Sequence, residues 1–295
     1  YHGGAVKLDG VSYKFIEDVN TQVLEYQKGN VDYVDVDPSI YPVYSSNPEL
    51  KDQMHGFQPT GNYNLLVNCK TYPDAKVREA IALSVDRAAI CDSILHGTAT
   101  VPTSYIPAGI IGHDDSLPEF EYNPEKAKQL LAEAGYENGE GFPALTYIVN
   151  NDSRKEIAES IVNDWKEILG IDSITVEKVE NFSAARRSGD YDLAYYGWFM
   201  DYTDLSNMYG TFINTGDANS FYQSDEYDKA YETAISADTQ DAQWEAYKEC
   251  DAILAKDLPV SVILHSMSSY LFDDTNYDGL VYSCGNFVFT YLKAL

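Results

Sequence analysis

The segment from Gly197 to Tyr202 carries the side chains best suited to hold a charged ligand. It sets Trp198 and Asp201 at the end of an apolar run, residues 191–198, that is typical of a buried strand. In α/β proteins, ligands bind at strand ends of this kind. A carboxylate in a partly dry cleft attracts an ammonium group strongly, and a neighbouring ring adds cation–π attraction. The segment therefore predicts a cation-binding site; the same pattern also suits a core tryptophan followed by an aspartate that caps the next turn.

The sequence offers little support for a catalytic, nucleotide-binding or metal-binding site. There is no GxSxG, HExxH, Walker or GxGxxG motif, and the five histidines form no i, i+3 or i, i+4 pair. Asp32, Asp35 and Asp37 lack the glycine and the distal glutamate of a calcium loop. Asp35 and Asp37 alternate with Val34 and Val36, as the wet face of a strand would. We therefore expect no metal site, no cofactor and no catalytic residue, although 47 acidic residues leave a two-carboxylate hydrolase open as an alternative.

The elements that must position these residues alternate between strands and helices, which predicts an α/β fold with mixed strand connections. Residues 98–122 hold several prolines and glycines and read as a long irregular connection. Asn123 and Pro124 mark the clearest helix start, with the stop at Gly135. Strands are expected at 11–16, 31–36, 62–68, 174–179, 191–198 and from 259 onward; further helices are expected at 21–28, 74–97, 154–169, 182–188, 225–237 and 240–256.

The composition is that of an acidic globular protein. The 295 residues are 44% apolar and carry 20 basic against 47 acidic side chains, a net charge of −27. Such a surface repels phosphate backbones, so nucleic acid is excluded as a partner. Nothing approaches 18 consecutive apolar residues, and the 25 tyrosines suit a binding surface. The cysteines have no CxxC spacing and leave three possible pairings open; they are Cys69, Cys91, Cys250 and Cys284.

Several separated motifs together resemble one known family. Residues 77–81 (VREAI) followed by 85–87 (VDR), and residues 122–136 (YNPEKAKQLLAEAGY), are similar to motifs of the bacterial extracellular solute-binding proteins of family 5. These include the oligopeptide- and dipeptide-binding proteins of ABC importers. Residues 189–201 resemble the family's GxYDLxxxGWxxD element, and residues 257–260 its late D-x-P strand entry. The order and spacing fit across essentially the whole chain.

The resemblance implies a periplasmic-binding-protein-like class II fold, in which two lobes joined by hinge strands close on a ligand. Tyr1-His2-Gly3 looks like a family motif cut short, which implies that the N-terminal part of the protein is missing and that this is the C-terminal portion. By analogy, residues 1–60 and 268–295 form the remainder of the first lobe, and residues 61–267 form the second, ligand-binding lobe. The hinge strands would pass near Tyr63 and His265.

The family's binding residues carry over to individual positions. In peptide-binding members, the aspartate of GWxxD pairs with the peptide's α-ammonium, and the matching residue is Asp201. Positions that hold the peptide carboxylate in some members match Arg154 and Arg186. A further such position is Tyr195 and not arginine, which departs from the pattern. The residues expected to line the pocket are Trp198, Phe199 and Tyr202.

The resemblance implies a non-enzymatic, monomeric receptor that captures peptides in an interlobe cleft and delivers them to the membrane permease subunits of an ABC importer. It implies an extracellular or periplasmic location, with a lipoprotein anchor through the missing N-terminus. Members of the family that bind nickel chelates, haem or oligosaccharides provide one alternative. A peptide-signal receptor or chaperone that uses the same cleft provides another, and an acid glycosidase or other hydrolase is the alternative from a different class.

Overall fold

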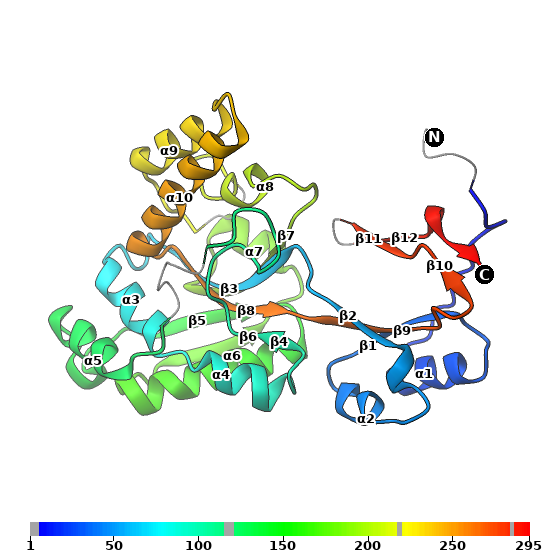
Figure 1. Cartoon of the computed structure of the whole chain (residues 1–295). Coiled ribbons are helices and arrows are strands. Elements are labelled where there is room, and N and C mark those ends of the chain that lie inside the picture. Colours follow the sequence, from blue (N-terminus) through cyan, green and yellow to red (C-terminus); the bar gives the residue numbers. More distant parts are fainter. Residues whose placement is uncertain (1–5, 115–120, 217–219, 284–285) are drawn as a thin grey trace.

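The computed structural model describes residues 6–114, 121–216, 220–283 and 286–295 (Figure 1). The chain forms two lobes of unequal size. The six-stranded lobe, residues 61–266, has helices on both faces of its sheet, and the three-stranded lobe comprises residues 6–57 together with 268–295. The predicted α/β two-lobe arrangement is confirmed.

The larger sheet is mixed, with strand order β4-β8-β3-β7-β5-β6. The central strand β3 runs antiparallel to both neighbours, whereas β5 runs parallel to β6 and β7. Strand β5 was missed from the sequence, because a five-residue apolar run next to a proline gives no clear period. The strands are β3 (Gly61–Val67), β4 (Ala99–Thr100), β5 (Leu145–Val149), β6 (Ile174–Lys178), β7 (Leu193–Phe199) and β8 (Val260–Ser266).

Helices cover this sheet and bury a separate core on each face. One core contains Trp165 and Tyr147, and the other contains Tyr209 and Tyr247; all four are at most 2% exposed. Both cores combine helices that are distant in sequence, so the lobe is closed by long-range packing. The helices are α3 (Ala75–Leu83), α4 (Arg87–Ala89), α5 (Pro124–Glu133), α6 (Asp152–Asp164), α7 (Phe182–Ser188), α8 (Ser206–Tyr209), α9 (Asp225–Ile235) and α10 (Gln240–Asp257). Short 3-10 or π turns are η2 (Ile90–Ile94), η3 (Glu137–Gly139) and η4 (Trp165–Leu169).

The predicted continuous helix over 74–97 is wrong. Helix α3 ends at Leu83, and a new helix starts after Asp86, whose side chain accepts a hydrogen bond from the Ala89 N–H. The helical spacing of apolar residues continues past the end of α3, because the π turn η2 keeps Ile90 buried against the same core as α3. A hydrophobic period therefore identified the buried face but not the continuity of the backbone.

The three-stranded lobe is built on a small antiparallel sheet of order β1-β9-β2. Helix α1 (Val19–Gln27) packs on one face and buries Val23 against Leu271. The helix ends before Gly29, which has a φ of 71°, as its sequence predicts. The remaining elements are β1 (Tyr33–Val36), α2 (Tyr41–Ser45), η1 (Lys51–Gln53), β2 (Met54–Phe57), β9 (Ser268–Phe272), β10 (Tyr277–Asp278), β11 (Val281–Ser283), β12 (Asn286–Val288), η5 (Phe289–Tyr291) and β13 (Lys293–Ala294).

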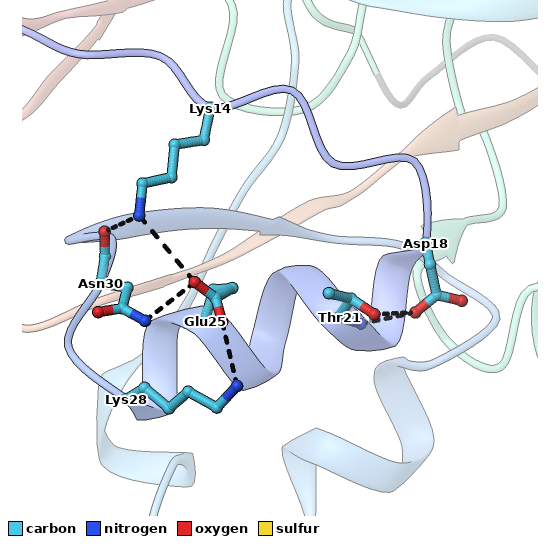
Figure 2. Close-up of polar contacts among 6 residues, drawn as sticks. All are labelled: Lys14, Asp18, Thr21, Glu25, Lys28 and Asn30. Atoms are coloured by element: carbon cyan, nitrogen blue, oxygen red, sulfur yellow. Dashed lines mark hydrogen bonds and ion pairs between the residues drawn. The ribbon is translucent and has the colours of Figure 1, made fainter.

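The strand predicted over 11–16 is wrong. These residues belong to none of the described sheets, and Phe15 is 99% exposed. Figure 2 shows what holds the segment instead: Lys14 Nζ donates to the Asn30 carbonyl at 2.8 Å and lies 4.0 Å from Glu25 Oε2. Lys28 Nζ also donates to Glu25, at 3.1 Å. Exposed ion pairs of this kind contribute little, and Gln22 Nε2 also donates to the Ile16 carbonyl at 2.7 Å.

Two stretches of chain cross between the lobes, and both are short. Residues 58–60 join β2 to β3, and Met267 alone separates β8 from β9 (Figure 1). Tyr63 and His265, where the hinge is expected to pass, lie within a few residues of these crossings, inside β3 and β8. Both crossings lie where strands of the larger sheet begin or end, since β3 begins at Gly61 and β8 ends at Ser266. This row of strand ends faces the other lobe and is called the crossing edge.

Candidate functional site

Strand β7 ends at the crossing edge, so the segment after it begins where the larger sheet meets a connection between the lobes. Phe199, its last residue, pairs with Gly61, the first residue of β3. The Met200 N–H then donates to the carbonyl of Thr60, in the crossing itself, at 2.9 Å. Asp201 therefore follows directly after the point where the six-stranded sheet meets the connection to the other lobe.

Asp201 is exposed, and no described residue pairs with its carboxylate. Only its backbone is held, because its N–H donates to the Oδ1 of Asn207 at 3.2 Å. Tyr202 is also exposed, at 52%, with its hydroxyl 3.5 Å from the Ser206 hydroxyl. An unpaired carboxylate at the crossing edge can accept a cationic group from a ligand without first breaking an internal ion pair.

The alternation of β7 splits the other predicted residues between two faces of the sheet. Tyr195 and Phe199 point to the face that carries Tyr63 and Arg154. Trp198 points to the opposite face, where its indole packs against the core with Tyr209 and donates to the Asn207 carbonyl at 2.9 Å. The seven predicted residues therefore do not form one continuous cluster.

Arg154 lies at a favourable position for an anionic group. It sits in the first turn of α6, where its guanidinium donates to Asn150 Oδ1 at 2.7 Å and to the Tyr63 hydroxyl at 3.3 Å. The group also stacks 4.8 Å from the Tyr63 ring centroid and 5.8 Å from that of Tyr195. In the described part of the chain no carboxylate neutralises it, so its charge remains available. Burial raises the pKa of Tyr195 strongly, so this phenol stays neutral beside it.

Arg186 lies elsewhere, on the face occupied by Trp198. It comes from α7, is only 4% exposed, and stacks 4.8 Å from the centroid of the Tyr196 ring. The structure does not bring it together with Arg154, because Tyr195 and Tyr196 contact the two arginines from opposite sides of β7. Its placement is that of a core-bound arginine.

A cavity of about 1080 Å³ lies at the crossing, between the three-stranded lobe and the edge of the larger sheet. Most of its side chains come from the smaller lobe and many are aromatic. Of the predicted residues only Phe199 lines it. Residues that the sequence analysis did not assign to the site include Tyr33, Phe57, Tyr63, Ser268 and Tyr282.

Aromatic contacts give this cavity a firm wall. The Phe57 and Tyr282 ring centroids are 3.9 Å apart, and Tyr63 meets Phe199 edge-on at 5.3 Å. A Cβ on Gly197 would lie 2.8 Å from the Tyr63 ring, so the glycine of the GW pair is what allows that ring to lie across β7. That glycine was the one sequence signal that could have pointed to Tyr63.

Two further predictions concern metal and sulfur. Among the described residues no three histidine, cysteine or acidic side chains gather in a way that could hold a metal ion. Cys69, Cys91 and Cys250 are free thiols, and burial raises the pKa of each, to about 11 for the first two and about 12 for Cys250. Cys284 lies outside the described residues, as do Tyr1, His2 and Gly3.

The chain belongs to the bacterial extracellular solute-binding proteins, family 5. The model of this family's middle region matches residues 1–220. The resemblance inferred from the motifs is confirmed. No helix among the described residues is long and apolar enough to cross a bilayer.

Individual relatives differ in the solute that their names give. The chain is 27% identical over 277 residues to the periplasmic oligopeptide-binding protein OppA of Haemophilus influenzae, covering 90% of this chain and 51% of OppA. It is 26% identical over 279 residues to heme-binding protein A of the same organism, covering 90% and 50%. The chain thus spans about half the length of the curated relatives it matches.

Solved structures agree on the fold. An oligopeptide-binding protein (OppAIV) of Borrelia burgdorferi superposes with a TM-score of 0.81 at 26% identity, covering 100% of this chain and 60% of that one. The Haemophilus influenzae OppA complex with the peptide RPPGFSPFR gives a TM-score of 0.77 at 25% identity, covering 94% and 56%. The predicted periplasmic-binding-protein-like fold is confirmed.

Proposed function

We propose that the protein is an extracellular receptor that captures peptides between its two lobes and delivers them to the permease subunits of an ABC importer. The observation that carries the proposal is the unpaired carboxylate of Asp201 at the crossing edge. Family membership supports the solute-binding role.

An α-ammonium is the ligand group that best fits this carboxylate. When the lobes close, water leaves the cleft and the attraction between opposite charges strengthens, because the local dielectric constant falls. A carboxylate without a protein partner gains more binding free energy from this closure than a carboxylate already paired with a protein cation. Asp201 is therefore proposed as the residue that recognises the N-terminus of the peptide.

Arg154 is proposed to attract the other end, the peptide carboxylate. Its guanidinium is oriented by Tyr63 and has no acidic partner among the described residues. Arginine suits this role because its planar fork matches the two carboxylate oxygens. Arg186 and Trp198, which lie on the other face, are proposed to support β7 from behind. Phe199 and Tyr202 are proposed to contact the ligand, with Tyr195 beneath them.

Capture requires binding and closure, and no bond is made or broken, so the proposed role is not enzymatic. We propose that residues 61–267 form the ligand-binding lobe and that residues 1–60 and 268–295 belong to the first lobe. The short crossings at 58–60 and Met267 support hinge motion between them. A ligand that contacts both lobes shifts the open–closed equilibrium towards the closed form, which the permease would recognise.

The proposed location is outside the cytoplasmic membrane, with the protein held there as a lipoprotein and acting as a monomer. The family description, which names extracellular proteins, supports the location. The anchor and the oligomeric state rest on the family analogy alone.

Native mass spectrometry of the protein, expressed from its whole coding region, tests the peptide assignment. The protein is measured as purified and after exchange against a pool of short synthetic peptides, beside the Asp201→Asn variant. Removing one partner of a desolvated charge pair costs about 2–5 kcal/mol, so affinity should fall by about 30-fold or more. The matched control is Asp172→Asn, an exposed acid before β6 with no described partner, which should bind as the parent does.

Two results would overturn the assignment. One is a parent protein that ignores the peptide pool. The other is a parent that retains haem, a metal chelate or an oligosaccharide to the same extent with and without the Asp201 carboxylate. Either would leave the family and the fold intact and replace the solute.

A further inference from the structure

Asn207 is a buried polar residue whose side-chain oxygen and backbone carbonyl both accept hydrogen bonds from the candidate site. It lies in α8 and is 9% exposed. Its Oδ1 accepts from the Trp198 indole at 3.1 Å and from the Asp201 backbone N–H at 3.2 Å. Its own carbonyl accepts from the same indole N–H at 2.9 Å. One residue thus holds both the ring and the backbone of the GWxxD element.

Other hydrogen bonds near Asp201 involve its neighbours Met200 and Asp204, and the Asp204 carbonyl accepts from the Asn207 N–H at 3.0 Å. Residues 201–203 are exposed, and the local hydrogen bonds of Asp204 stay within the segment: its N–H donates to the Tyr202 carbonyl, and its Oδ1 accepts from the Ser206 N–H. On the other side, the Met200 N–H is tied to the Thr60 carbonyl. Between these two anchors, the Asn207 amide oxygen is the side-chain atom that fixes the backbone at Asp201, as far as the described residues extend.

We propose that Asn207 is a positioning residue, which presents the Asp201 carboxylate to the ligand by holding the Asp201 backbone and the Trp198 indole through a single amide oxygen. This inference rests on the proposed role of Asp201.

The physical basis is preorganisation. A carboxylate that is fixed before the ligand arrives loses little conformational freedom on binding, whereas one on a loose loop must be ordered at the expense of affinity. Removing the acceptor also leaves the Asp201 N–H without its partner in a partly buried place. Together these effects should weaken binding of an ammonium group by about tenfold.

Two substitutions at Asn207 separate the effect of the hydrogen-bond acceptor from the effect of side-chain shape. Asn207→Leu keeps the approximate volume and removes the oxygen. Asn207→Asp keeps an acceptor at the same place and adds negative charge close to Asp201, which favours a cationic ligand. If the acceptor is what matters, the aspartate variant rescues what the leucine variant loses.

The test measures affinity for a pool of short synthetic peptides with free N-termini and for the same pool after N-acetylation, by titration calorimetry on the full-length protein. We expect Asn207→Leu to bind the free-amine pool about tenfold more weakly and the acetylated pool unchanged, and Asn207→Asp to restore the preference. If the leucine variant does not fold, Asn207→Ser, whose hydroxyl is too short to reach, takes its place.

Equal weakening towards both pools would show a structural role only and overturn the inference, as would an unchanged preference in the leucine variant. The Asp201→Asn variant distinguishes a failure of the proposed function from a failure of the positioning role of Asn207. If Asp201→Asn keeps the preference for the free amine, the proposed function has failed. If Asp201→Asn loses the preference and Asn207→Leu keeps it, only the positioning role has failed.

Discussion

The two lobes differ most in what they bury. The six-stranded lobe buries five arginine, aspartate or histidine side chains at 5% exposure or less, whereas in the described part of the three-stranded lobe the only residue classed as buried and polar is Ser269. The five are Arg78, Arg87, Arg186, Asp251 and His265. Arg78 and Arg87 are buried with backbone carbonyls as hydrogen-bond acceptors for their guanidinium groups. Arg87, for example, donates to the carbonyl of Val262 at 2.7 Å and to the Ser261 hydroxyl at 2.7 Å.

The smaller lobe has one apolar core, between α1 and the three-stranded sheet. The opposite face of that sheet carries Tyr33, stacked on Tyr270 at 5.4 Å, and contributes to the cavity wall. Its stability therefore depends on fewer apolar contacts and on no buried charge among the described residues. The comparison indicates that the larger lobe is the rigid platform for the site, with a stability linked to pH, and that the smaller lobe is the more easily deformed partner.

A matched pair of core truncations tests this difference and has the largest expected effect. Leu66 in β3 and Leu271 in β9 are both 0% exposed. Leu66→Ala should lower the free energy of unfolding by about 4–5 kcal/mol, because a sheet packed on both faces cannot collapse into the cavity. Leu271→Ala should cost about 2–3 kcal/mol, because a one-sided core relaxes more readily. Urea denaturation followed by circular dichroism measures both, and an equal or larger loss for Leu271→Ala would contradict the comparison.

The buried acid Asp251 should make the larger lobe less stable as pH rises. Burial, with the charge of Asp114 adding to it, raises the pKa of Asp251 to about 7, while a hydrogen bond from Tyr209 and the charge of His113 act in the opposite direction. Between about pH 4 and 7 the unfolded chain loses a proton that the folded chain keeps, so stability falls over this window. Asp251→Asn should remove that fall and be about 1–3 kcal/mol more stable than the parent at pH 8, measured by urea denaturation. A variant less stable than the parent at pH 8 would refute the prediction.

The buried histidine His265 should act with the opposite sign. Burial, reinforced by the charge of His113, lowers the pKa of His265 to about 4, although its hydrogen bond with the backbone of Ser104 opposes the shift. Below about pH 6.5 the unfolded chain gains a proton that the folded chain refuses, so stability is lost as pH falls towards 4. His265→Gln should remove about 1–2 kcal/mol of the loss that the parent shows between pH 7 and pH 5. An identical acid slope in parent and variant would show that His265 titrates normally.

The smallest effect is expected in the smaller lobe, at Phe15. Its side chain is 99% exposed and lies on the segment that makes no ladder. Phe15→Ser should change the free energy of unfolding by less than about 0.5 kcal/mol, because it removes no buried surface. A loss above 1 kcal/mol would mean that the segment packs against something in the intact protein, and the measurement is the same urea titration.

Local signals in the sequence identified most of the elements. The N-cap of α5 is an example: the Asn123 side chain accepts a hydrogen bond from the Lys126 N–H, as the Asn-Pro-Glu start predicts. Gly170, with a φ of 72°, ends the helical run after Trp165 in the same local way. The failures have a common origin. The strand at 11–16 needed a neighbour to pair with, and the break at Ser84–Asp86 was decided by side-chain capping that a hydrophobic period does not register.

The candidate site shows the same division. The GWxxD element and the family motifs are sequence-local, and the sequence alone established the family and singled out Asp201. Only the tertiary structure placed Arg154 beside Tyr63, put Arg186 on the opposite face of β7, and brought Asn207 under the backbone of Asp201. The reason is physical: caps, glycine stops and periods depend on interactions within a few residues. The face that a strand residue occupies, and the side chain that meets it, depend on register and packing between segments far apart in the chain.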